Sequence, residues 1–130
     1  MRADIVIYNL LKDDHTIFPI IVPQAVQVAD GNVYLTYNII DSEATVSKNS
    51  FNDYDRYMFQ ISFFSKDLNA AASSAEQVRT TLDRYTGTIT VDAVDYNVQL
   101  IRYESQEFVG YDEDLEVYMI AADYNVIMTQ

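Results

Sequence analysis

The pattern of hydrophobic positions changes its period once, within the stretch from Tyr57 to Tyr85. The first eight residues alternate, which predicts a strand with one face formed by Tyr57, Phe59, Ile61 and Phe63. The apolar residues that follow recur at helical steps, and their stripe consists of Leu68, Ala71, Ala72, Ala75, Val78, Leu82 and Tyr85. Asp67 or Ser65 is expected to cap the first turn, and Gly87 to end the helix. We therefore expect a helix that packs through small alanines on the sheet containing the strand.

The remaining patterns predict a second, shorter helix and several more strands. The helix is expected over Ala3–Leu11, although its β-branched residues also favour a strand. Extended chain or strands are expected over residues 17–24, 33–40, 88–91, 96–108 and 116–128. The inner face of the last strand is expected to carry Tyr118, Ile120, Ala122, Tyr124, Val126 and Met128. Residues 41–55 are polar without a strong period, and form either a mobile loop or the distal half of a long hairpin.

This order of elements predicts an α+β fold in a single domain that spans residues 1–130. The expected architecture is an antiparallel sheet of about four to five strands, packed with a long helix on one face, plus a short N-terminal helix. Hydrophobic residues make up 49% and charged residues 22%, which is ordinary for a folded soluble protein. No apolar run is long enough to cross a bilayer, and the first residues lack the cleavage pattern of a signal peptide.

Charge and residue choice narrow the function classes further. Eight Lys and Arg against twenty Asp and Glu give a formal net charge of −12, which repels nucleic acid and anionic membranes. A conventional DNA- or RNA-binding protein is therefore not expected, and the simplest interpretation of the acidity is solubility. The chain contains no cysteine, which excludes disulfides, thiolate metal sites and a cysteine nucleophile, and fits an intracellular origin.

No residue pattern makes a positive case for an enzyme, a cofactor or a metal. His15, the single histidine, lies in a polar turn, and no G-x-S-x-G stretch supplies a nucleophile, so we interpret it as a surface residue. Asp112, Asp114 and Glu116 alternate like calcium ligands, but the run lacks the glycine and the distant glutamate of a calcium loop. Solvated acids in a turn are the preferred interpretation. Any two of the twenty acids could form the carboxylate pair of a glycosidase, yet the sequence singles out no particular pair.

The order and spacing of several segments resemble the small tail-completion, or tail-to-head joining, proteins of long-tailed bacteriophages. The matching segments span nearly the whole chain, and are LLKDD at the end of the first helix, IFPIIVPQ, YLTYNII, RYMFQISFFS, AAASSAEQVRTTLD and a final pair of strands. The more telling pieces are VPQ followed by the Y-x-x-Y strand, and Val78, Arg79 and Leu82 of the long helix.

The resemblance implies a structural virion protein rather than an enzyme. Members of this family form a ring, usually sixfold, at the head-proximal end of the tail, where it meets the connector of the filled head. The implied partners are further copies of the chain, the tail tube protein and the head-connector proteins. DNA would pass through the channel without specific binding, and no membrane is involved. The implied location is the head–tail interface of the virion, after assembly in the host cytoplasm, and the family has no catalytic, cofactor-binding or metal-binding residues to carry over.

Polar loops and exposed tyrosines are the expected contacts of such a subunit. The alanines of the long helix could pack against another subunit, but packing on the chain's own sheet is preferred. Eleven tyrosines in a small domain leave some exposed, and tyrosine is common in protein interfaces. The candidate subunit or partner contacts are Ser47, Lys48, Asn49, Phe51, Tyr54, Tyr57, Tyr111, Asp112 and Asp114, with Tyr103 and Tyr118 as further tyrosine candidates.

Two other function classes stay open. An acidic protein that mimics DNA and inhibits a DNA-binding partner would carry acids spaced like phosphates along one exposed face. A small hydrolase would have a concave pocket with two close carboxylates. In the ring hypothesis, acids on the wall of the channel would repel DNA and let it slide without adhering.

Overall fold

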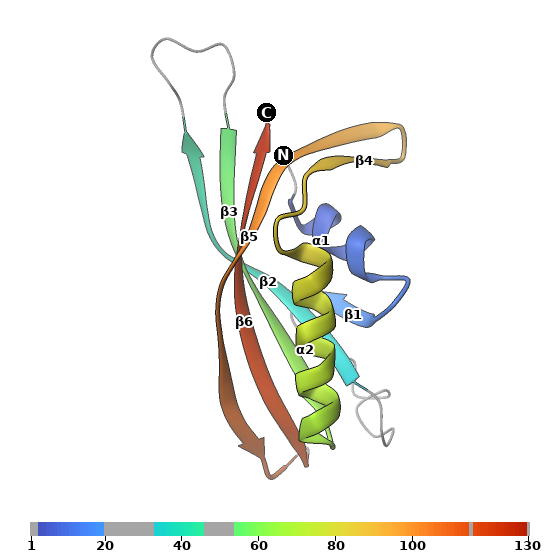
Figure 1. Ribbon diagram of the computed structural model, residues 1–130, viewed down its shortest axis with the longest axis vertical. Helices are drawn as coiled ribbons and strands as arrows, with labels where there is room; N and C mark the ends of the chain where they lie inside the picture. Colours follow the sequence, from blue (N-terminus) through green and yellow to red (C-terminus); the bar gives the residue numbers. More distant parts are fainter. Residues whose placement is uncertain (1–2, 20–32, 46–53, 115, 130) are drawn as a thin grey trace.

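The computed structural model describes residues 3–19, 33–45, 54–114 and 116–129. Within them the chain forms two helices and a sheet of six strands (Figure 1). In chain order the elements are α1 (Ala3–Leu11), β1 (Thr16–Pro19), β2 (Val33–Thr45), β3 (Tyr54–Ser65), α2 (Leu68–Leu82), β4 (Gly87–Val91), β5 (Val94–Asp112) and β6 (Val117–Thr129). The strands lie in the order β1-β2-β3-β6-β5-β4, with β1 parallel to β2 and every other neighbouring pair antiparallel.

The fold class predicted from the sequence is wrong, because the sheet is mixed and six-stranded rather than antiparallel with about four to five strands. The edge strand β1 has only four residues, too few to show a period. Its direction relative to β2 depends on the path of the chain between them, which a hydrophobic pattern does not encode. Of the two interpretations of residues 41–55, the long hairpin is confirmed for the described residues 41–45 and 54–55, because β2 continues to Thr45 and its backbone groups pair there with β3.

Helix α2 begins as predicted but ends earlier. The Asp67 carboxylate accepts a hydrogen bond from the backbone N–H of Asn69 at 3.0 Å, which caps the first turn. The helix stops at Leu82, and Arg84 takes the left-handed backbone conformation, with φ of 67°, that the sequence assigned to Gly87. The reason is tertiary: the backbone N–H of Arg84 donates to the carbonyl oxygen of Ile101 in β5 at 2.7 Å, so the chain leaves the helix to join the sheet.

The two helices and the sheet share one core. The helix predicted over Ala3–Leu11 is confirmed, and it buries Ala3, Val6, Ile7 and Leu11. The alanine stripe of α2 packs on the sheet of its own chain, as preferred from the sequence, with Ala71, Ala75, Val78 and Leu82 fully buried. The sheet contributes Phe59, Ile61 and Phe63 from β3 and the predicted inner face of β6 from Ile120 to Met128. Leu68 is the exception in the predicted stripe, because 38% of it stays exposed.

Candidate functional site: the far end of the β5–β6 hairpin

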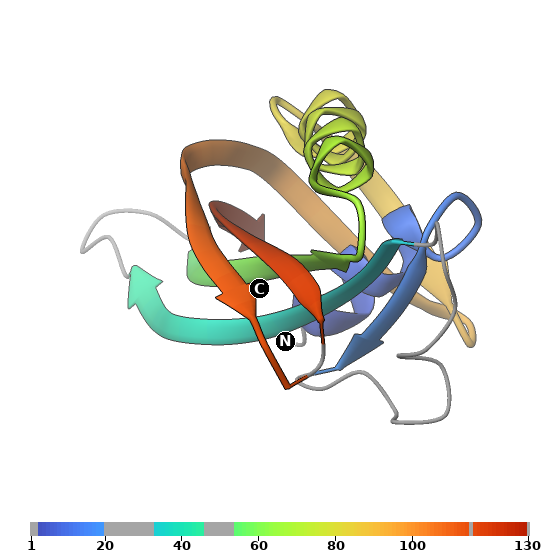
Figure 2. The same cartoon turned by 90° about the horizontal axis from the view of Figure 1, so that it is seen from below.

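Strand β5 is the longest element, with 19 residues, and its course determines where the candidate site lies. Its pairing with β6 shifts three times, between Val98 and Leu100, between Tyr103 and Ser105, and between Phe108 and Gly110. Each shift inserts one extra residue into β5, a β-bulge that bends and twists the strand. Figures 1 and 2 show the result: β5 curves along its length, from its pairing with β4 to the turn that leads into β6.

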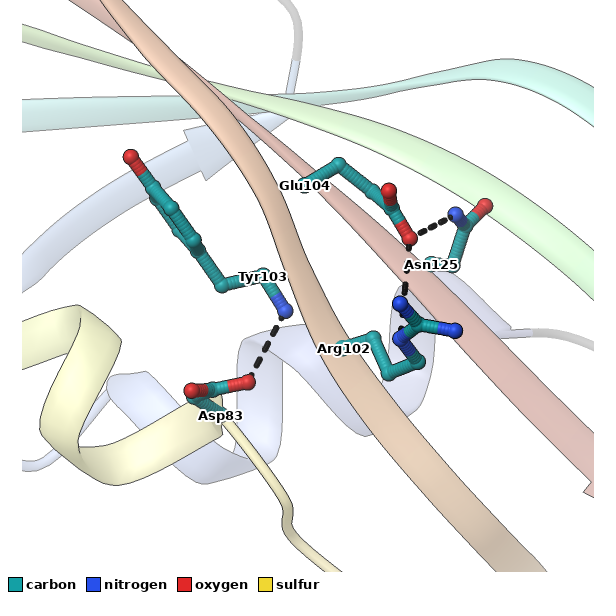
Figure 3. Close-up of polar contacts among 5 residues, drawn as sticks. All are labelled: Asp83, Arg102, Tyr103, Glu104 and Asn125. Atoms are coloured by element: carbon teal, nitrogen blue, oxygen red, sulfur yellow. Dashed lines mark hydrogen bonds and ion pairs between the residues drawn. The ribbon is translucent and has the colours of Figure 1, made fainter.

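The middle bulge of β5 is tied to its surroundings on both faces of the sheet (Figure 3). Towards α2, the backbone N–H of Tyr103 donates to the carboxylate of Asp83 at 3.0 Å. On the opposite face, the bulged residue Glu104 accepts a hydrogen bond from Asn125 of β6 at 2.6 Å and lies 3.9 Å from the guanidinium of Arg102. The ion pair is largely solvated and contributes little stability, so these contacts chiefly fix the position of the bend.

Beside this bend, aromatic rings fill the space between α2 and the sheet. The guanidinium of Arg79 lies 3.9 Å from the centroid of the Tyr103 ring, which packs edge to face on Tyr124 with centroids 5.7 Å apart. Tyr124 is fully buried, and its hydroxyl has no hydrogen-bond partner among the described residues. Burial, and after it the neighbouring Tyr103, raises the pKa of the Tyr124 hydroxyl above its ordinary value, while Arg79 opposes this.

Replacing Tyr124 by phenylalanine is expected to stabilise the protein by about 1 kcal/mol at pH 7, because it removes a buried hydroxyl without a partner. The raised pKa adds a second expectation. The unfolded state loses its proton first, so the stability present below the ordinary tyrosine pKa of about 10 decreases as the pH rises above it. Urea unfolding at pH 7 and pH 10.5 should show less alkaline destabilisation in Tyr124→Phe than in the wild type. Exposed Tyr111→Phe is the matched control, and a loss of stability in Tyr124→Phe at pH 7 would contradict the argument.

Beyond the bend, three aromatic side chains form what we call the hairpin patch: Phe108, Tyr111 and Tyr118. Phe108 pairs with Ile120, a core residue, and Tyr111 pairs with Tyr118, so all three lie on the face of the sheet that carries the core. The Tyr118 ring lies 4.9 Å from that of Tyr111 and 6.4 Å from that of Phe108 between centroids. Phe108 is nevertheless 55% exposed and Tyr111 49% exposed. The patch therefore continues the core face to a point that neither α1 nor α2 covers.

The hairpin patch borders the acidic turn between β5 and β6. Asp112 accepts a hydrogen bond from the backbone N–H of Asp114 at 2.9 Å, which closes the turn, and Glu116 adopts a left-handed conformation with φ of 57°. Asp112, Glu113, Asp114 and Glu116 are all exposed. The structure thus brings together four of the predicted contact residues at one end of the sheet: Tyr111, Asp112, Asp114 and the further tyrosine candidate Tyr118.

The other predicted contacts do not join this group. Four of them lie outside the described residues: Ser47, Lys48, Asn49 and Phe51. Tyr54 is the first residue of β3, and only its backbone is described. Tyr57 lies on β3 opposite Val126, whereas Ser65 lies opposite Tyr118, so Tyr57 is about 26 Å along the sheet from the hairpin patch. It is half-buried and donates a hydrogen bond to Asp55 at 3.4 Å. Burial, followed by Asp55, raises the pKa of its hydroxyl.

Phe108 and the adjacent Val109 were not among the contacts predicted from the sequence, although both are about half exposed. The signal that indicates them is Gly110, which interrupts an otherwise apolar and aromatic run. A glycine inside a strand often marks a bulge, and here Val109 is the extra residue opposite the step from Met119 to Ile120. The sequence does not show which of the neighbouring apolar side chains are exposed to solvent, because this depends on the position of the bulge.

Residues considered for chemistry give no assembled active site in the described part of the chain. His15 is half-buried, and burial, opposed by Asp14, lowers its pKa. No group of three His, Cys, Asp or Glu side chains among the described residues is arranged to bind a metal ion. No described helix has the length and apolar character to span a membrane. That the protein is not an enzyme stays a prediction.

Comparison with known proteins gives a fold but no family. No family model and no curated protein matches the sequence. The structure is similar to a chain in a solved structure described as the virion of a native gene transfer agent particle, with a TM-score of 0.59 and 13% sequence identity. The match covers 100% of this chain and 89% of that chain. At this identity the likeness concerns the fold alone, so this chain shares its fold with a chain found in the virion of a gene transfer agent.

Proposed function

We propose that this protein is a structural component of a bacteriophage or phage-like virion. The observation that carries the proposal is the fold similarity to a gene transfer agent virion chain, which covers this whole chain. The resemblance of the sequence to tail-completion proteins points to the same class of particle by a separate route, since it rests on residue patterns rather than on the fold.

Within the virion, we place the protein in a ring at the head-proximal end of the tail, where it joins tail and head. The long sheet supports this role, because its candidate contacts lie at both ends. Tyr111, Asp112 and Asp114 lie at the β5–β6 turn, whereas the candidates Tyr54 and Tyr57 lie on β3 towards the opposite end of the sheet. A subunit with contact regions about 26 Å apart or more along its sheet suits a position between two different assemblies.

The acidity of the chain fits a protein that DNA passes without binding. A net charge of −12, repeated around a ring, would generate a negative field over the channel and would prevent DNA from adhering to its wall. The same charge would also suit an inhibitor that mimics DNA, but that role does not account for the fold similarity to a virion chain.

The location of the protein is tested by gold labelling of an epitope-tagged copy in purified particles, viewed by electron microscopy. Label at the head–tail junction is expected. In a producer strain that lacks the protein, separate filled heads and tails should accumulate, and the tagged copy should restore joined particles. Label elsewhere on the particle would contradict the joining role, and a protein absent from purified particles would contradict the virion role altogether.

A further inference from the structure

We propose that the hairpin patch binds a different protein, whose contacting surface is positively charged and carries apolar side chains, and not a second copy of this chain. The inference deepens the proposed function, on which it rests for the identity of the particle. It specifies the chemistry of one partner. It also implies that the contacts between copies in a ring are made elsewhere on the subunit.

Large aromatic rings are exposed in the hairpin patch and are already fixed by contacts with one another. Phe108 and Tyr111 each expose about half of their surface, while their contacts with Tyr118 hold the rings in place before any partner arrives. Aromatic side chains of this kind are typical anchors of protein interfaces, because they bury a large area and lose little conformational freedom. The closed turn at Asp112 and Asp114 adds to this pre-organisation.

The surroundings of the patch carry a negative charge. After Arg102 the sequence contains seven carboxylates and no Lys, Arg or His. Four exposed acids lie in the turn next to the patch, whereas exposed Glu107, which pairs with Ala121, lies on the opposite face of the sheet from Phe108. Lys66 follows Ser65, which pairs with Tyr118, and one lysine leaves the acids in clear excess. Two copies that met through this surface would bring like charges together, whereas a basic partner would be attracted and oriented.

The edge of β5 next to the patch is irregular. β4 pairs only with residues from Val94 to Val98, so the outer edge of β5 is not covered by β4 beyond that point. The bulges at Glu104 and Val109 twist this edge and interrupt its regular hydrogen-bonding pattern. Such bulges disfavour the addition of a strand from another copy. The contact is therefore made by the side chains of the patch and its acidic border rather than by extension of the sheet.

The test measures binding of the purified protein to heads and to tails taken from a producer strain that lacks it. Sedimentation at 50 to 500 mM NaCl separates bound from free protein. The wild type should bind one of the two particles and should bind less as salt rises, because salt screens the attraction. The variant E113Q/D114N/E116Q should bind about tenfold more weakly at low salt, with a flatter salt dependence. These three side chains are exposed, so the fold should be unaffected.

Two further variants complete the design. D13N/D14N/E76Q also removes three exposed carboxylates, from −12 to −9 by the same count, but away from the patch, and it should bind like the wild type. F108A/Y111A should lose about tenfold or more in binding at every salt concentration, because it removes the apolar anchors.

The outcomes separate the two proposals. If the wild type binds neither heads nor tails, the joining role and the present inference both fail. If it binds but E113Q/D114N/E116Q binds equally well, the joining role stands and the inference of a basic partner fails. If F108A/Y111A converts an oligomer of the purified wild type into monomers, as measured by light scattering, the patch is a contact between copies and the inference also fails.

Discussion

Replacing Phe63 by alanine is expected to cost about 3–5 kcal/mol of unfolding free energy, the range found for buried phenylalanines. Phe63 is fully buried in β3, where it lies between Leu35 of β2 and Ile120 of β6. Its removal leaves a cavity in the centre of the core, and the sheet on either side prevents that cavity from collapsing. Since small domains are stable by only about 5–15 kcal/mol, the variant should be close to unfolding at 25 °C.

Urea unfolding followed by far-ultraviolet circular dichroism is the suitable measurement, because the chain has no tryptophan to report by fluorescence. Phe108→Ala is the matched control: it deletes the same side chain at a position that is 55% exposed, and should change the unfolding free energy by less than about 1 kcal/mol. If Phe63→Ala is too unstable to purify, Phe63→Leu should still lose about 1 kcal/mol. Equal effects of Phe63→Ala and Phe108→Ala would contradict the assignment of the core.

Replacing Ala75 by leucine is expected to destabilise the protein by about 1–3 kcal/mol or more, because the position has no room for a larger side chain. Ala75 is fully buried where α2 packs on the sheet. A leucine there must push the helix away from the sheet or adopt a strained rotamer. The change separates the two interpretations of the alanine stripe, since an alanine that contacted only another subunit would tolerate leucine in the isolated chain.

Ser73→Leu is the matched control for this helix. Ser73 lies two residues before Ala75 on α2 and is exposed, so a leucine at this position should change stability by no more than about 0.5 kcal/mol. Thermal unfolding of the two variants at equal protein concentration gives the comparison. A midpoint for Ala75→Leu equal to that of Ser73→Leu would show that the helix does not lie against the sheet at this position.

Much of the local structure follows from the sequence pattern, and the reasons are visible in particular elements. α1 and α2 bury an apolar stripe at helical spacing, and β6 buries every second residue from Ile120 to Met128. In each case one face packs into the core and imprints its period on the sequence, although in β6 Ala121 and Asn125 of the other face are buried as well. The cap at Asp67 is likewise local, because a carboxylate can reach the N–H two residues ahead without help from the rest of the fold.

The candidate site was predicted only in part. Tyr111, Asp112 and Asp114 are neighbours in the sequence, and their proximity needed no tertiary information. That Phe108 and Tyr118 join Tyr111 in one patch depends on the bulge at Val109, which shifts the register of β5 against β6 by one residue. A shift by one residue exchanges the two faces of a strand, so the exposed set cannot be read from alternation alone.

By itself, the sequence determined the two helices, the inner face of the last strand and the acidity that argues against nucleic-acid binding, because each depends on the periodicity or the sum of its own residues. Only the tertiary structure decided the parallel pairing of β1, the six-strand order, the early end of α2 and the exposure of the hairpin patch. These features depend on hydrogen bonds and cover supplied by residues far along the chain, such as the carbonyl of Ile101 that draws Arg84 out of the helix. Backbone pairing uses the same groups in every residue, so it leaves no mark in the pattern of side chains.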